Sequence, residues 1–477
     1  MSDGIVPQHI LIVGAGVFGL STALSLLSNA AYKRSRITIV DGSPSLPNPY
    51  GSSVDASRIV RADYIYKHYS RLALEAQGLW RDTTQDGWGG EGRYHEPGFV
   101  LTADEATGGR YVKEALDTVR KLAAEDDTRS WVDATKLKEL ENPDQIRAAT
   151  GYNQVSGNYG YANFNSGWAD AEKSVAYALR RIRQEGGDRV TIRSGSHVAK
   201  VLVSTPERCT GVELVGGEQI TADLTVLAAG AWTPTLIDLR GRCLATGQTL
   251  GYVDITEDEV KAMQDRPTIM NMSRGMFIIP PRTKELKIAR HGYGYLNPVE
   301  IPRKNILPGL LNVDLDGGQA EAGEVVQVSI PKVNIPIPLE GQNALREALR
   351  GLVPHIAERP FSKTRLCWYC DTPTGDFLIT YHPRYQNLFI ATGGSGHGFK
   401  FFPVIGDKIV EAIQGKLDAE LTKQWRWRTD AELAAAGIDK DFNACDDGSR
   451  AGPKGMTLEE EVAKGGNETV TSRASRL

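Results

Sequence analysis

The sequence contains little cysteine, no long apolar run and no excess of charge of one sign. Five cysteines in 477 residues are too few and too scattered for a disulfide framework, which indicates a reducing compartment. No apolar stretch approaches the roughly 18 residues that span a bilayer, and the N-terminal MSDGIVPQHILIVGAG lacks the basic stretch and apolar core of a secretory signal. We therefore expect a soluble protein that is made in the cytosol and has no membrane partner.

The charge and the length of the chain further limit which classes of protein it can belong to. The 55 basic and 59 acidic residues are spread along the chain and leave a net charge of -4, so no basic face for nucleic acid is expected. Because 41% of the residues are hydrophobic, a chain of this length can bury more than one core, and we expect two domains or one domain with a large insertion. Nothing in the sequence indicates the oligomeric state.

Two of the cysteines, Cys367 and Cys370, lie three positions apart in TRLCWYCD (364–371). A closed structural zinc site needs four ligands, and no second cysteine or histidine pair is near, so we predict no metal site. A thioredoxin-like redox pair begins a helix after a strand, whereas this pair lies in β-rich sequence close to Pro373. Two buried thiols of the core remain an alternative.

Residues 9–27, HILIVGAGVFGLSTALSLL, predict a strand, a tight turn and a helix. In this pattern Gly14 permits the turn, Gly16 lets a pyrophosphate approach the backbone, and Gly19 lets the helix pack close to the strand. A second predicted strand ends at Asp41, about 20 residues beyond Gly19, where an acidic side chain binds ribose hydroxyls. The pattern predicts a dinucleotide site and does not by itself separate NAD from FAD.

Later regions contain further nucleotide-type elements. Residues 164–181 predict a turn and an amphipathic helix, and residues 190–203 predict two strands around a Gly-Ser turn. LTVLAAGAW (224–232) is a buried strand that enters a glycine turn, and residues 387–413 predict a strand, a glycine-rich loop and a helix. Since such elements occur at the start, middle and end of the chain, we predict one sheet assembled from all three, which favours FAD over a contiguous nicotinamide domain.

The chain resembles a known family over roughly residues 8–428: the FAD-dependent amine oxidases that include monomeric sarcosine oxidase, pipecolate and saccharopine oxidases and the fungal fructosyl amino acid oxidases (amadoriases). The motifs that carry the resemblance are LIVGAGVFG, GSSVDASRIVRADY (51–64), SGWADAEKS, VLAAGAW, RLCWYCDTPTGDFLITYHP (365–383) and ATGGSGHGFKF (391–401). They occur in the family's order and at about its spacing.

The resemblance implies an α/β fold with two parts. A discontinuous Rossmann-type FAD-binding domain is expected from residues 1–90, 150–235 and 365–430. An α+β substrate domain on a largely antiparallel sheet is expected from residues 91–149 and 236–364. Residues 431–477 are polar and glycine-rich, and we expect them to form a loosely attached tail.

The resemblance also implies the cofactor site. Family members bind FAD covalently through a cysteine at the position of Cys367, whereas Cys370 falls where relatives vary. The residues expected to bind the cofactor are Gly14, Gly16, Gly19, Asp41, Ser52, Ser53, Arg61, Val198, Ala229, Gly230, Cys367, Gly396, His397, Gly398, Phe399 and Lys400.

Arg58 and Arg61 lie three apart beside the loop Gly51-Ser52-Ser53, and two planar guanidiniums suit a carboxylate. From charge pattern alone, two surface arginines are an equal alternative. In sarcosine oxidase-like members, the matching arginines and the lysine of SGHGFK, here Lys400, surround the substrate carboxylate.

Residues 275–294, GMFIIPPRTKELKIARHGYG, predict a hairpin whose second strand carries Lys287 and His291. A lysine and a histidine at this spacing recur in the family, where the lysine lies over the flavin and activates oxygen. A fixed cation in a water-poor site stabilises the negative charge of reduced O2. A solvated strand lysine is the alternative for Lys287, Lys284 is a rival for its role, and His291 and His397 can equally be packed histidines.

The implied reaction is the oxidation of a secondary amine or amino acid, N-alkyl or cyclic, by hydride transfer from the carbon beside nitrogen to flavin N5. The products are an imine and, with O2, hydrogen peroxide. Lys287, Arg61 and Lys400 are the expected catalytic residues, and Arg58, Arg61, Lys400 and His291 are expected to bind the substrate.

Alternatives remain for the substrate. The Arg-x-x-Arg pattern favours a carboxylated amine, whereas CWYCDT and Trp-Arg-Trp-Arg (425–428) favour a fructosyl amino acid oxidase. A biosynthetic oxidase whose imine cyclises, and a dehydrogenase that reduces a partner protein, are also open.

The tripeptide Ser475-Arg476-Leu477 is a variant of the Ser-Lys-Leu address that peroxisomal import receptors bind. Peroxisomes contain the means to destroy hydrogen peroxide, so this address agrees with the implied chemistry. We expect the import receptor as a partner and the peroxisome as the location, with the cytoplasm as the alternative.

Overall fold

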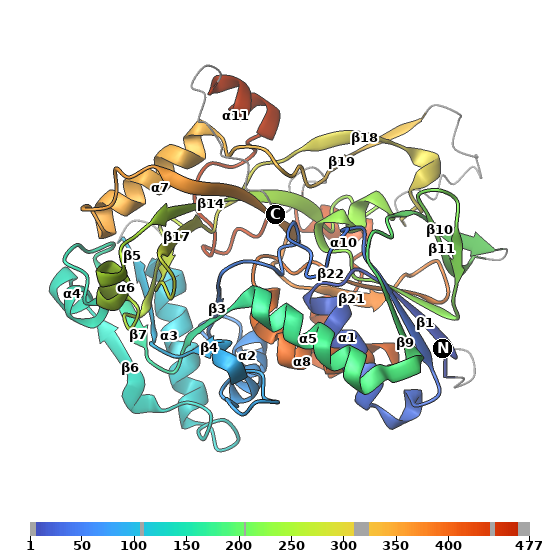
Figure 1. The fold of residues 1–477 in the computed structure, drawn as a ribbon, viewed down its shortest axis with the longest axis horizontal. Coiled ribbons are helices and arrows are strands. Elements are labelled where there is room, and N and C mark those ends of the chain that lie inside the picture. The colour runs from blue at the N-terminus through green and yellow to red at the C-terminus, as the bar shows by residue number, and fades with distance from the viewer. Residues whose placement is uncertain (1–5, 105–108, 205–206, 310–323, 439–443, 466–477) are drawn as a thin grey trace.

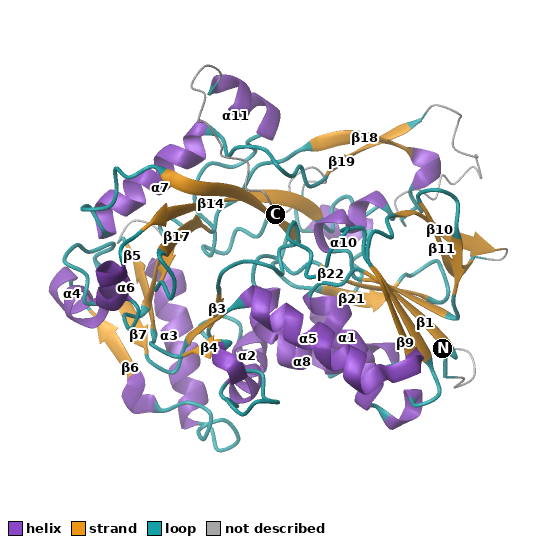
Figure 2. Ribbon diagram, in the orientation of Figure 1, coloured by secondary structure: helices purple, strands orange, loops and turns teal. Residues whose placement is uncertain are grey.

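The computed structural model describes residues 6–104, 109–204, 207–309, 324–438 and 444–465. Two large sheets form the framework of the fold (Figure 1). A six-stranded sheet lies at the right of that view and an eight-stranded sheet at the left. Helices cover one face of the first sheet and the outer side of the second, as the purple and orange ribbons of Figure 2 show.

The six-stranded sheet draws on the start, the middle and the end of the chain, as predicted. Its strands, in spatial order, are β21 (Leu378–Tyr381), β22 (Leu388–Thr392), β13 (Leu224–Leu227), β1 (His9–Val13), β2 (Arg36–Val40) and β9 (Val190–Arg193). All neighbours run parallel except β21, which pairs antiparallel with β22 at the edge.

This sheet is buried on both faces, which explains why its strands are continuously apolar. Ile10 and Ile12 belong to the core on the helical side, and Leu11 and Val13 belong to the core on the other side. The helices that contribute to the helical side are α1 (Val17–Ser28), α2 (Lys67–Trp80), α5 (Ala171–Gly186) and α8 (Phe402–Ile413). On the other side lies an antiparallel sheet of β10 (Val198–Ser204), β11 (Arg208–Leu214) and β12 (Gln219–Thr221).

The eight-stranded sheet is largely antiparallel. Its strands, in spatial order, are β20 (Phe361–Asp371), β14 (Leu244–Asp254), β17 (Glu285–Arg290), β16 (Met276–Ile279), β15 (Thr268–Asn271), β5 (Phe99–Ala103), β7 (Tyr159–Asn163) and β6 (Leu137–Leu140). Only β15 and β5 are parallel neighbours. The predicted hairpin at 275–294 is present as β16 and β17. The expected fold class, an α/β nucleotide-binding part with an α+β part on a largely antiparallel sheet, is confirmed.

Smaller elements complete the fold. Two small sheets comprise β3 (Arg58–Val60), β8 (Gly167–Ala169) and β4 (Tyr94–His95), and β18 (Pro298–Pro302) with β19 (Val325–Ser329). The remaining helices are α3 (Gly109–Ala124), α4 (Pro143–Thr150), α6 (Glu257–Met263), α7 (Leu339–Leu352), α9 (Ala419–Trp425), α10 (Asp430–Ala435) and α11 (Leu458–Lys464).

The domain boundaries drawn from the sequence stay a prediction. Within ranges predicted for the FAD-binding domain, β7 and residues 365–371 of β20 pair in the eight-stranded sheet. Both are edge or near-edge strands of that sheet, joined to it by antiparallel pairing along most of their length. A boundary read from motifs alone does not detect such pairing, because it is set by distant partner strands.

The expectation of a loosely attached tail is wrong for residues 444–465. Arg450 is buried and donates to Asp371 and to the Ser395 carbonyl, the latter at 3.0 Å. The Leu296 backbone pairs with residues 456 and 458 at 2.8 and 2.7 Å. This segment is therefore anchored by one buried ion pair and by backbone hydrogen bonds, which a count of apolar residues does not register. Ser475-Arg476-Leu477 lies outside the described residues.

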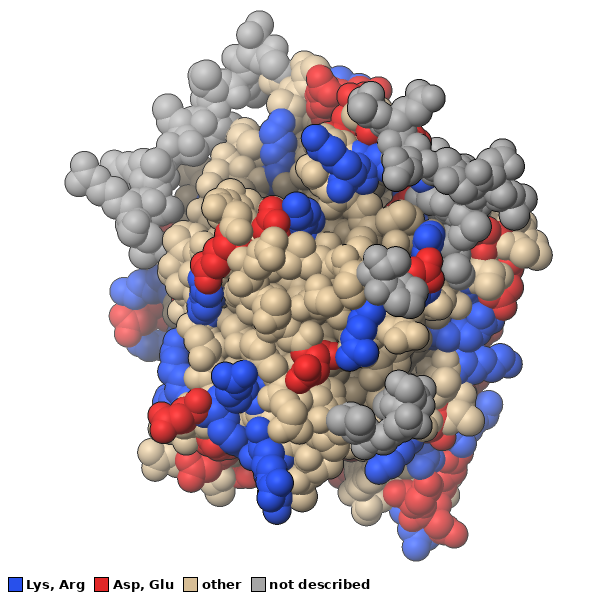
Figure 3. Space-filling model, turned by 90° about the vertical axis from the view of Figure 1, so that its right-hand side faces the viewer, with Lys and Arg blue, Asp and Glu red and all other residues tan. Residues whose placement is uncertain are grey.

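The surface carries both signs of charge. On the face drawn in Figure 3, Lys and Arg side chains lie beside Asp and Glu side chains in several places, with broad uncharged areas between them. Within the described ranges, none of the helices combines the length and the apolar character that crossing a membrane requires.

Candidate active site

A cavity of about 410 Å³ opens at the carboxyl ends of β1 and β2, between the two large sheets. Its walls are residues 13–18 and 40–44, the loop 50–54, residues 196–198 and 228–232, and parts of the glycine loop 394–399. The carboxyl end of a parallel sheet is where nucleotide ligands bind in open α/β folds. We refer to this space as the long cavity.

The glycine turn at the mouth of α1 has the geometry that the motif predicts. Gly14 has φ +111°, and a Cβ atom there would lie 2.4 Å from the Ala228 carbonyl oxygen. A Cβ atom on Gly19 would lie 2.0 Å from the Gly14 oxygen, so only glycine lets α1 approach the turn this closely. Gly16 lines the long cavity at the N-terminus of α1. Gly19 does not line it, and its contribution is to packing.

Asp41 directly follows β2 and lines the long cavity. One carboxylate oxygen accepts from the Ala15 backbone N–H at 2.9 Å, and the other accepts from the Ser43 backbone N–H at 2.9 Å. Ser53 Oγ accepts from the Val17 N–H, in the first turn of α1, at 3.0 Å. The other predicted cofactor residues that line this cavity are Ser52, Val198, Ala229, Gly230, Gly396, Gly398 and Phe399.

A second cavity of about 70 Å³, the small cavity, adjoins the long one. Four residues border both spaces: Arg58, Tyr369, Gly396 and Phe399. Lys287, His291, Cys367, His397, Arg61 and Lys400 line the small cavity only. The predicted catalytic and substrate-binding residues are thus brought together at one end of the long cavity.

The two cysteines of TRLCWYCD are separated by the geometry of β20. Side chains alternate along a strand, so residues three positions apart face opposite sides. Cys367 faces the small cavity, where an Arg58 N–H donates to its Sγ at 3.3 Å. Cys370 belongs to the core that contains Leu11 and Val13 and also lines the long cavity; it accepts from Thr392 Oγ1 at 3.3 Å and shares a thiol hydrogen bond with Cys243. The spacing that resembles a CxxC pair therefore places its members in different environments.

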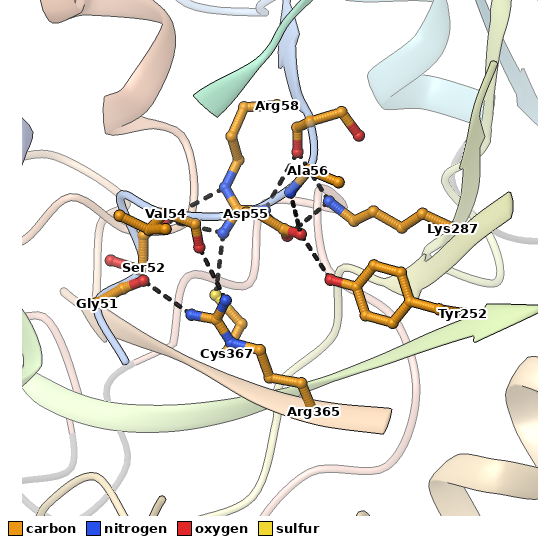
Figure 4. A network of polar contacts seen from close by, with 11 residues as sticks. Gly51, Ser52, Val54, Asp55, Ala56, Arg58, Tyr252, Lys287, Arg365 and Cys367 are labelled. Carbon is orange, nitrogen blue, oxygen red and sulfur yellow. Dashed lines mark hydrogen bonds and ion pairs between the residues drawn. The ribbon is translucent and has the colours of Figure 1, made fainter. Parts of the chain in front are cut away.

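Asp55 lies at the centre of a polar network beside the small cavity (Figure 4). Lys287 Nζ donates to its carboxylate at 2.7 Å and the Tyr252 hydroxyl donates at 2.5 Å. The Arg58 guanidinium forms a short ion pair with the same carboxylate. Arg365 holds the loop 51–54 in place by donating to the carbonyls of Gly51 and Val54, each at 2.8 Å.

The charges of this network shift its pKa values. Burial alone would raise the pKa of Asp55, but Lys287, Arg58 and Arg365 together hold it well below its usual range. Burial lowers the pKa of Lys287, Asp55 raises it and Arg58 lowers it, and together these effects bring it to about 8. Lys284, the rival in the same hairpin, is 70% exposed and lies 3.7 Å from Glu257.

Arg61 and Lys400 form a second pair of buried cations. Arg61 donates to the Asp63 carbonyl and lies over the rings of Tyr64 and Phe99. Lys400 Nζ donates to the Tyr64 hydroxyl at 2.7 Å and to the His397 carbonyl at 3.1 Å. Burial, and then Arg61, lower the pKa of Lys400 well below its usual value. Among the described residues neither cation has a salt-bridge partner, in contrast to Arg58 and Lys287.

Comparison with known proteins assigns the family. The family described as "FAD dependent oxidoreductase" matches residues 9–412. The chain is 34% identical over 455 residues to the amino acid oxidase imqH of Aspergillus flavus, covering 85% of this chain and 93% of that protein. The chain belongs to the FAD-dependent oxidoreductase family. The family resemblance read from the motifs is confirmed.

Two further proteins similar to this FAD-dependent oxidoreductase are named as oxidases. L-saccharopine oxidase of Schizosaccharomyces pombe is 29% identical over 446 residues, with 89% of this chain and 94% of that protein covered. The crystal structure of fructosamine oxidase (Amadoriase II) of Aspergillus fumigatus superposes with a TM-score of 0.73 at 26% identity, covering 94% of this chain and 95% of that one.

The residues around the long cavity fit FAD. The open N-terminus of α1, free of a Cβ atom at Gly16, suits a pyrophosphate. The Asp41 carboxylate at the end of β2 suits ribose hydroxyls. The glycine loop 394–399 and Arg58 border the end where the two cavities meet, which leaves room there for the cofactor's reactive ring.

The two predicted histidines have different surroundings in this FAD-dependent oxidoreductase. Both ring nitrogens of His397 are engaged, Nδ1 with the Tyr64 hydroxyl at 3.0 Å and Nε2 with the Gly375 carbonyl at 2.8 Å. The His291 ring lies against Tyr369, with ring centroids 5.8 Å apart. Burial, followed by nearby cations, lowers the pKa of both histidines well below the usual value, so both rings are neutral at pH 7.

Asp55 and Arg450 are among the residues of this site that sequence reasoning missed. Asp55 lies inside the quoted motif GSSVDASRIVRADY, and an acid three residues before Arg58 was the available signal. Arg450 lies in the C-terminal segment, about 5.3 Å above the Tyr369 ring, and no motif marks it. Its charge reaches the small cavity, because it contributes to lowering the pKa of His291.

Proposed function

We propose that this FAD-dependent oxidoreductase oxidises a secondary amine that carries a carboxylate, an N-alkyl or cyclic amino acid, to an imine with release of hydrogen peroxide. The observation that carries the proposal is the Arg61–Lys400 pair in the wall of the small cavity. The Asp63 carboxylate raises the pKa of both cations, but neither forms a salt bridge among the described residues. Two buried cations of this kind are costly unless an anion joins them. A substrate carboxylate would satisfy both.

The Arg61–Lys400 pair also bears on the protonation state of the amine. A secondary amine must be neutral before its lone pair can assist loss of hydride, and nearby cations disfavour the ammonium form. When bound, FAD accepts the hydride from the carbon beside nitrogen and passes the electrons to O2. Because burial lowers the pKa of Lys400, a carboxylate that binds beside it raises that pKa again and couples substrate binding to proton uptake.

Lys287 is the proposed residue of the oxygen step. It lies in the small cavity within 2.7 Å of Asp55, and its pKa of about 8 keeps it mostly charged at pH 7. A fixed cation in a buried site stabilises negative charge that develops on O2. Lys284 is exposed and is a weaker candidate.

Cys367 is the proposed attachment point for the flavin. Cys367 borders the small cavity, where Arg58 Nη2 donates to its Sγ at 3.3 Å. After precipitation in acid, the yellow colour should stay with the protein and should be lost in Cys367→Ser. Cys370→Ser is the matched control and should keep the colour. Release of free FAD from the unmodified protein would exclude covalent attachment.

A fructosyl amino acid oxidase is the second candidate, favoured by the likeness to Amadoriase II. The walls of the small cavity are less suited to a sugar. Leu250, Met270, Phe277 and Ile279 contribute apolar surface, which offers no hydrogen bonds to sugar hydroxyls. A biosynthetic oxidase whose imine cyclises shares the carboxylated-amine chemistry and differs in the fate of the product.

A panel of amines without oxygen tests the substrate class. N-methyl amino acids, pipecolate, saccharopine and fructosyl amino acids are scored by bleaching of the flavin, and peroxide is then measured in air. Pipecolate and piperidine form a matched pair, because only pipecolate has the carboxylate; we expect piperidine to bleach the flavin at least a hundredfold more slowly. Fastest bleaching by a fructosyl amino acid would favour the second candidate, and no bleaching by any amine would contradict both.

We also propose that Ser475-Arg476-Leu477 directs import into peroxisomes. The support is the match to the import address and the production of peroxide. A fluorescent fusion that ends in these residues should accumulate in peroxisomes, and one that lacks them should stay in the cytosol.

A further inference from the structure

Asp55 is a buried carboxylate placed among cations and away from both cavities. Its side chain is about 1% exposed and lines neither the long nor the small cavity. Two of its partners, Arg58 and Lys287, do line the small cavity. Asp55 therefore cannot touch a ligand in that space, but it contacts two groups that can.

The contacts fix the direction of both cations. Lys287 Nζ is held between the Asp55 carboxylate at 2.7 Å and the Ser57 carbonyl at 2.8 Å. A lysine side chain can rotate about four bonds, so two fixed acceptors for its ammonium group select one orientation from many. The Tyr252 hydroxyl from β14 holds the carboxylate itself at 2.5 Å.

Arg58 is fixed in the same way. One nitrogen of its guanidinium pairs with Asp55, and Nη2 donates to the Ser52 carbonyl at 2.8 Å and to Cys367 Sγ at 3.3 Å. The single Asp55 carboxylate thus joins a cation on β17 to a cation on β3 (Figure 4).

We propose that Asp55 is a positioning residue for the oxygen step: it holds Lys287 charged and pointed toward the small cavity. The inference rests on the proposed function, since the oxygen role of Lys287 belongs to it. Asp55 acts through Lys287, so its effect should vanish when Lys287 is absent.

The influence of Asp55 on Lys287 should change the pH dependence of the reaction with oxygen. The charged and titratable groups that surround Lys287 are Asp55, Arg58, Arg61, Tyr252, Glu285, Arg290, His291, Lys363, Arg365, Cys367, Tyr369, His397 and Lys400. Of these, Asp55 raises the pKa of Lys287 most strongly, against burial and Arg58. Loss of the Asp55 charge lowers that pKa further, and Lys287 then loses its proton at a lower pH.

The first test uses the holoenzyme without any amine. The flavin is reduced with dithionite, mixed with O2, and its reoxidation rate is followed from pH 6 to pH 10. In the unmodified protein we expect the rate to fall through a midpoint near pH 8. In Asp55→Asn we expect the midpoint to move down by about one unit or more, which slows reoxidation about fivefold at pH 8.

Two comparisons make the result specific. In the Lys287→Met background, Asp55→Asn should change the rate by less than about twofold, because the residue through which it acts is gone. Tyr252→Phe removes a hydrogen bond to Asp55 but keeps its charge, and its midpoint should move by less than about 0.3 units. An unshifted midpoint in Asp55→Asn, or an equal effect in the Lys287→Met background, would overturn the proposal.

Thermal unfolding gives a readout that does not depend on turnover. Asp55→Asn leaves two buried cations, Lys287 and Arg58, without their carboxylate, whereas in the double variant only Arg58 is left without it. We therefore expect the double variant Asp55→Asn/Lys287→Met to melt above Asp55→Asn alone. Strictly additive losses would contradict a direct coupling. Because neither measurement needs a substrate, failure of the amine panel would reject the proposed function without deciding the role of Asp55.

Discussion

Lys400 and Lys287 are both about 4% exposed, yet their partners differ. Lys287 forms an ion pair with Asp55. Lys400 instead donates to a hydroxyl and a carbonyl, and the charge of Arg61 acts on it. A buried ammonium with neutral partners gains most from an incoming anion. The two lysines should therefore affect different constants: Lys400 the binding of substrate, and Lys287 the reaction with oxygen.

Lys400→Met should raise KM for a carboxylated amine by roughly tenfold or more, the usual loss for a hydrogen bond to a charged group. Oxygen reactivity of the dithionite-reduced enzyme should change much less, since Lys287 is untouched. Steady-state kinetics with varied amine and varied O2 separate the two constants. Lys284→Met, an exposed lysine of the β16–β17 hairpin, is the control and should leave KM within about twofold. An unchanged KM in Lys400→Met would remove Lys400 from the binding site.

At the scale of elements, close packing of α1 on the glycine turn sets the shape of the long cavity. A Cβ atom on Gly19 would meet backbone rather than a flexible side chain, so the helix must shift. Gly78 in α2 offers a contrast, because nothing lies within 4 Å of a Cβ atom placed there. Replacing glycine by alanine should therefore lower the free energy of unfolding in α1 and raise it in α2.

Gly19→Ala should destabilise the fold by about 2–3 kcal/mol, the usual cost of overpacking. Gly78→Ala should stabilise it by about 0.5–1 kcal/mol, because alanine restricts the unfolded chain in an exposed helix. Denaturant unfolding of both variants measures these changes, and FAD content should fall in Gly19→Ala only. Similar effects of the two substitutions on stability and FAD content would mean that the close approach of α1 to the glycine turn is not needed for either.

The sequence was sufficient for the elements whose determinants are local. The glycine turn, the acid that ends β2, the β16–β17 hairpin and the strand at 224–227 each follow from residues within one short stretch. The pairing of β7 and β20 into the eight-stranded sheet was not predictable in this way, because it depends on distant strands.

The same distinction applies to the residues of the site. The different roles of Cys367 and Cys370 came from family resemblance, although strand alternation alone separates residues three apart once the segment is known to be a strand. Asp55 was overlooked because its partners, Tyr252 and Lys287, lie about 200 residues further along the chain and become neighbours only in the folded sheet. Arg450 was overlooked for the same reason.

At the scale of the whole molecule, buried neutral histidines should make the fold sensitive to acid. His382 shows the cause most clearly. Its Nδ1 accepts the backbone N–H groups of Arg384 and Tyr385 at 3.1 and 3.2 Å, so protonation of that nitrogen breaks both bonds. Burial, then Arg384 and Arg242, lower the pKa of His382 to about 4.

The direction of the pH effect follows from this shift. The pKa of an unfolded histidine is about 6.5. Between pH 6.5 and pH 4, His382 is therefore protonated in the unfolded chain and neutral in the folded protein. The free energy of unfolding therefore falls as the pH falls, by about 2 kcal/mol between pH 8 and pH 5 from His382 alone. His291 and His397, whose pKa values are also lowered by burial, add to the loss.

Thermal unfolding at pH 8, 6.5 and 5 tests this prediction, and His382→Gln isolates one contribution. The variant should unfold at a lower temperature than the unmodified protein at pH 8, because it loses a packed ring beside Trp427. Its further loss of Tm between pH 8 and pH 5 should be smaller, since the titrating group is gone. His355→Gln replaces a side chain that is 58% exposed and should keep the full pH dependence. If His382→Gln lost as much Tm between pH 8 and pH 5 as the unmodified protein, the acid sensitivity would come from other groups, among them His68, His95, His291 and His397, whose pKa values are also lowered by burial.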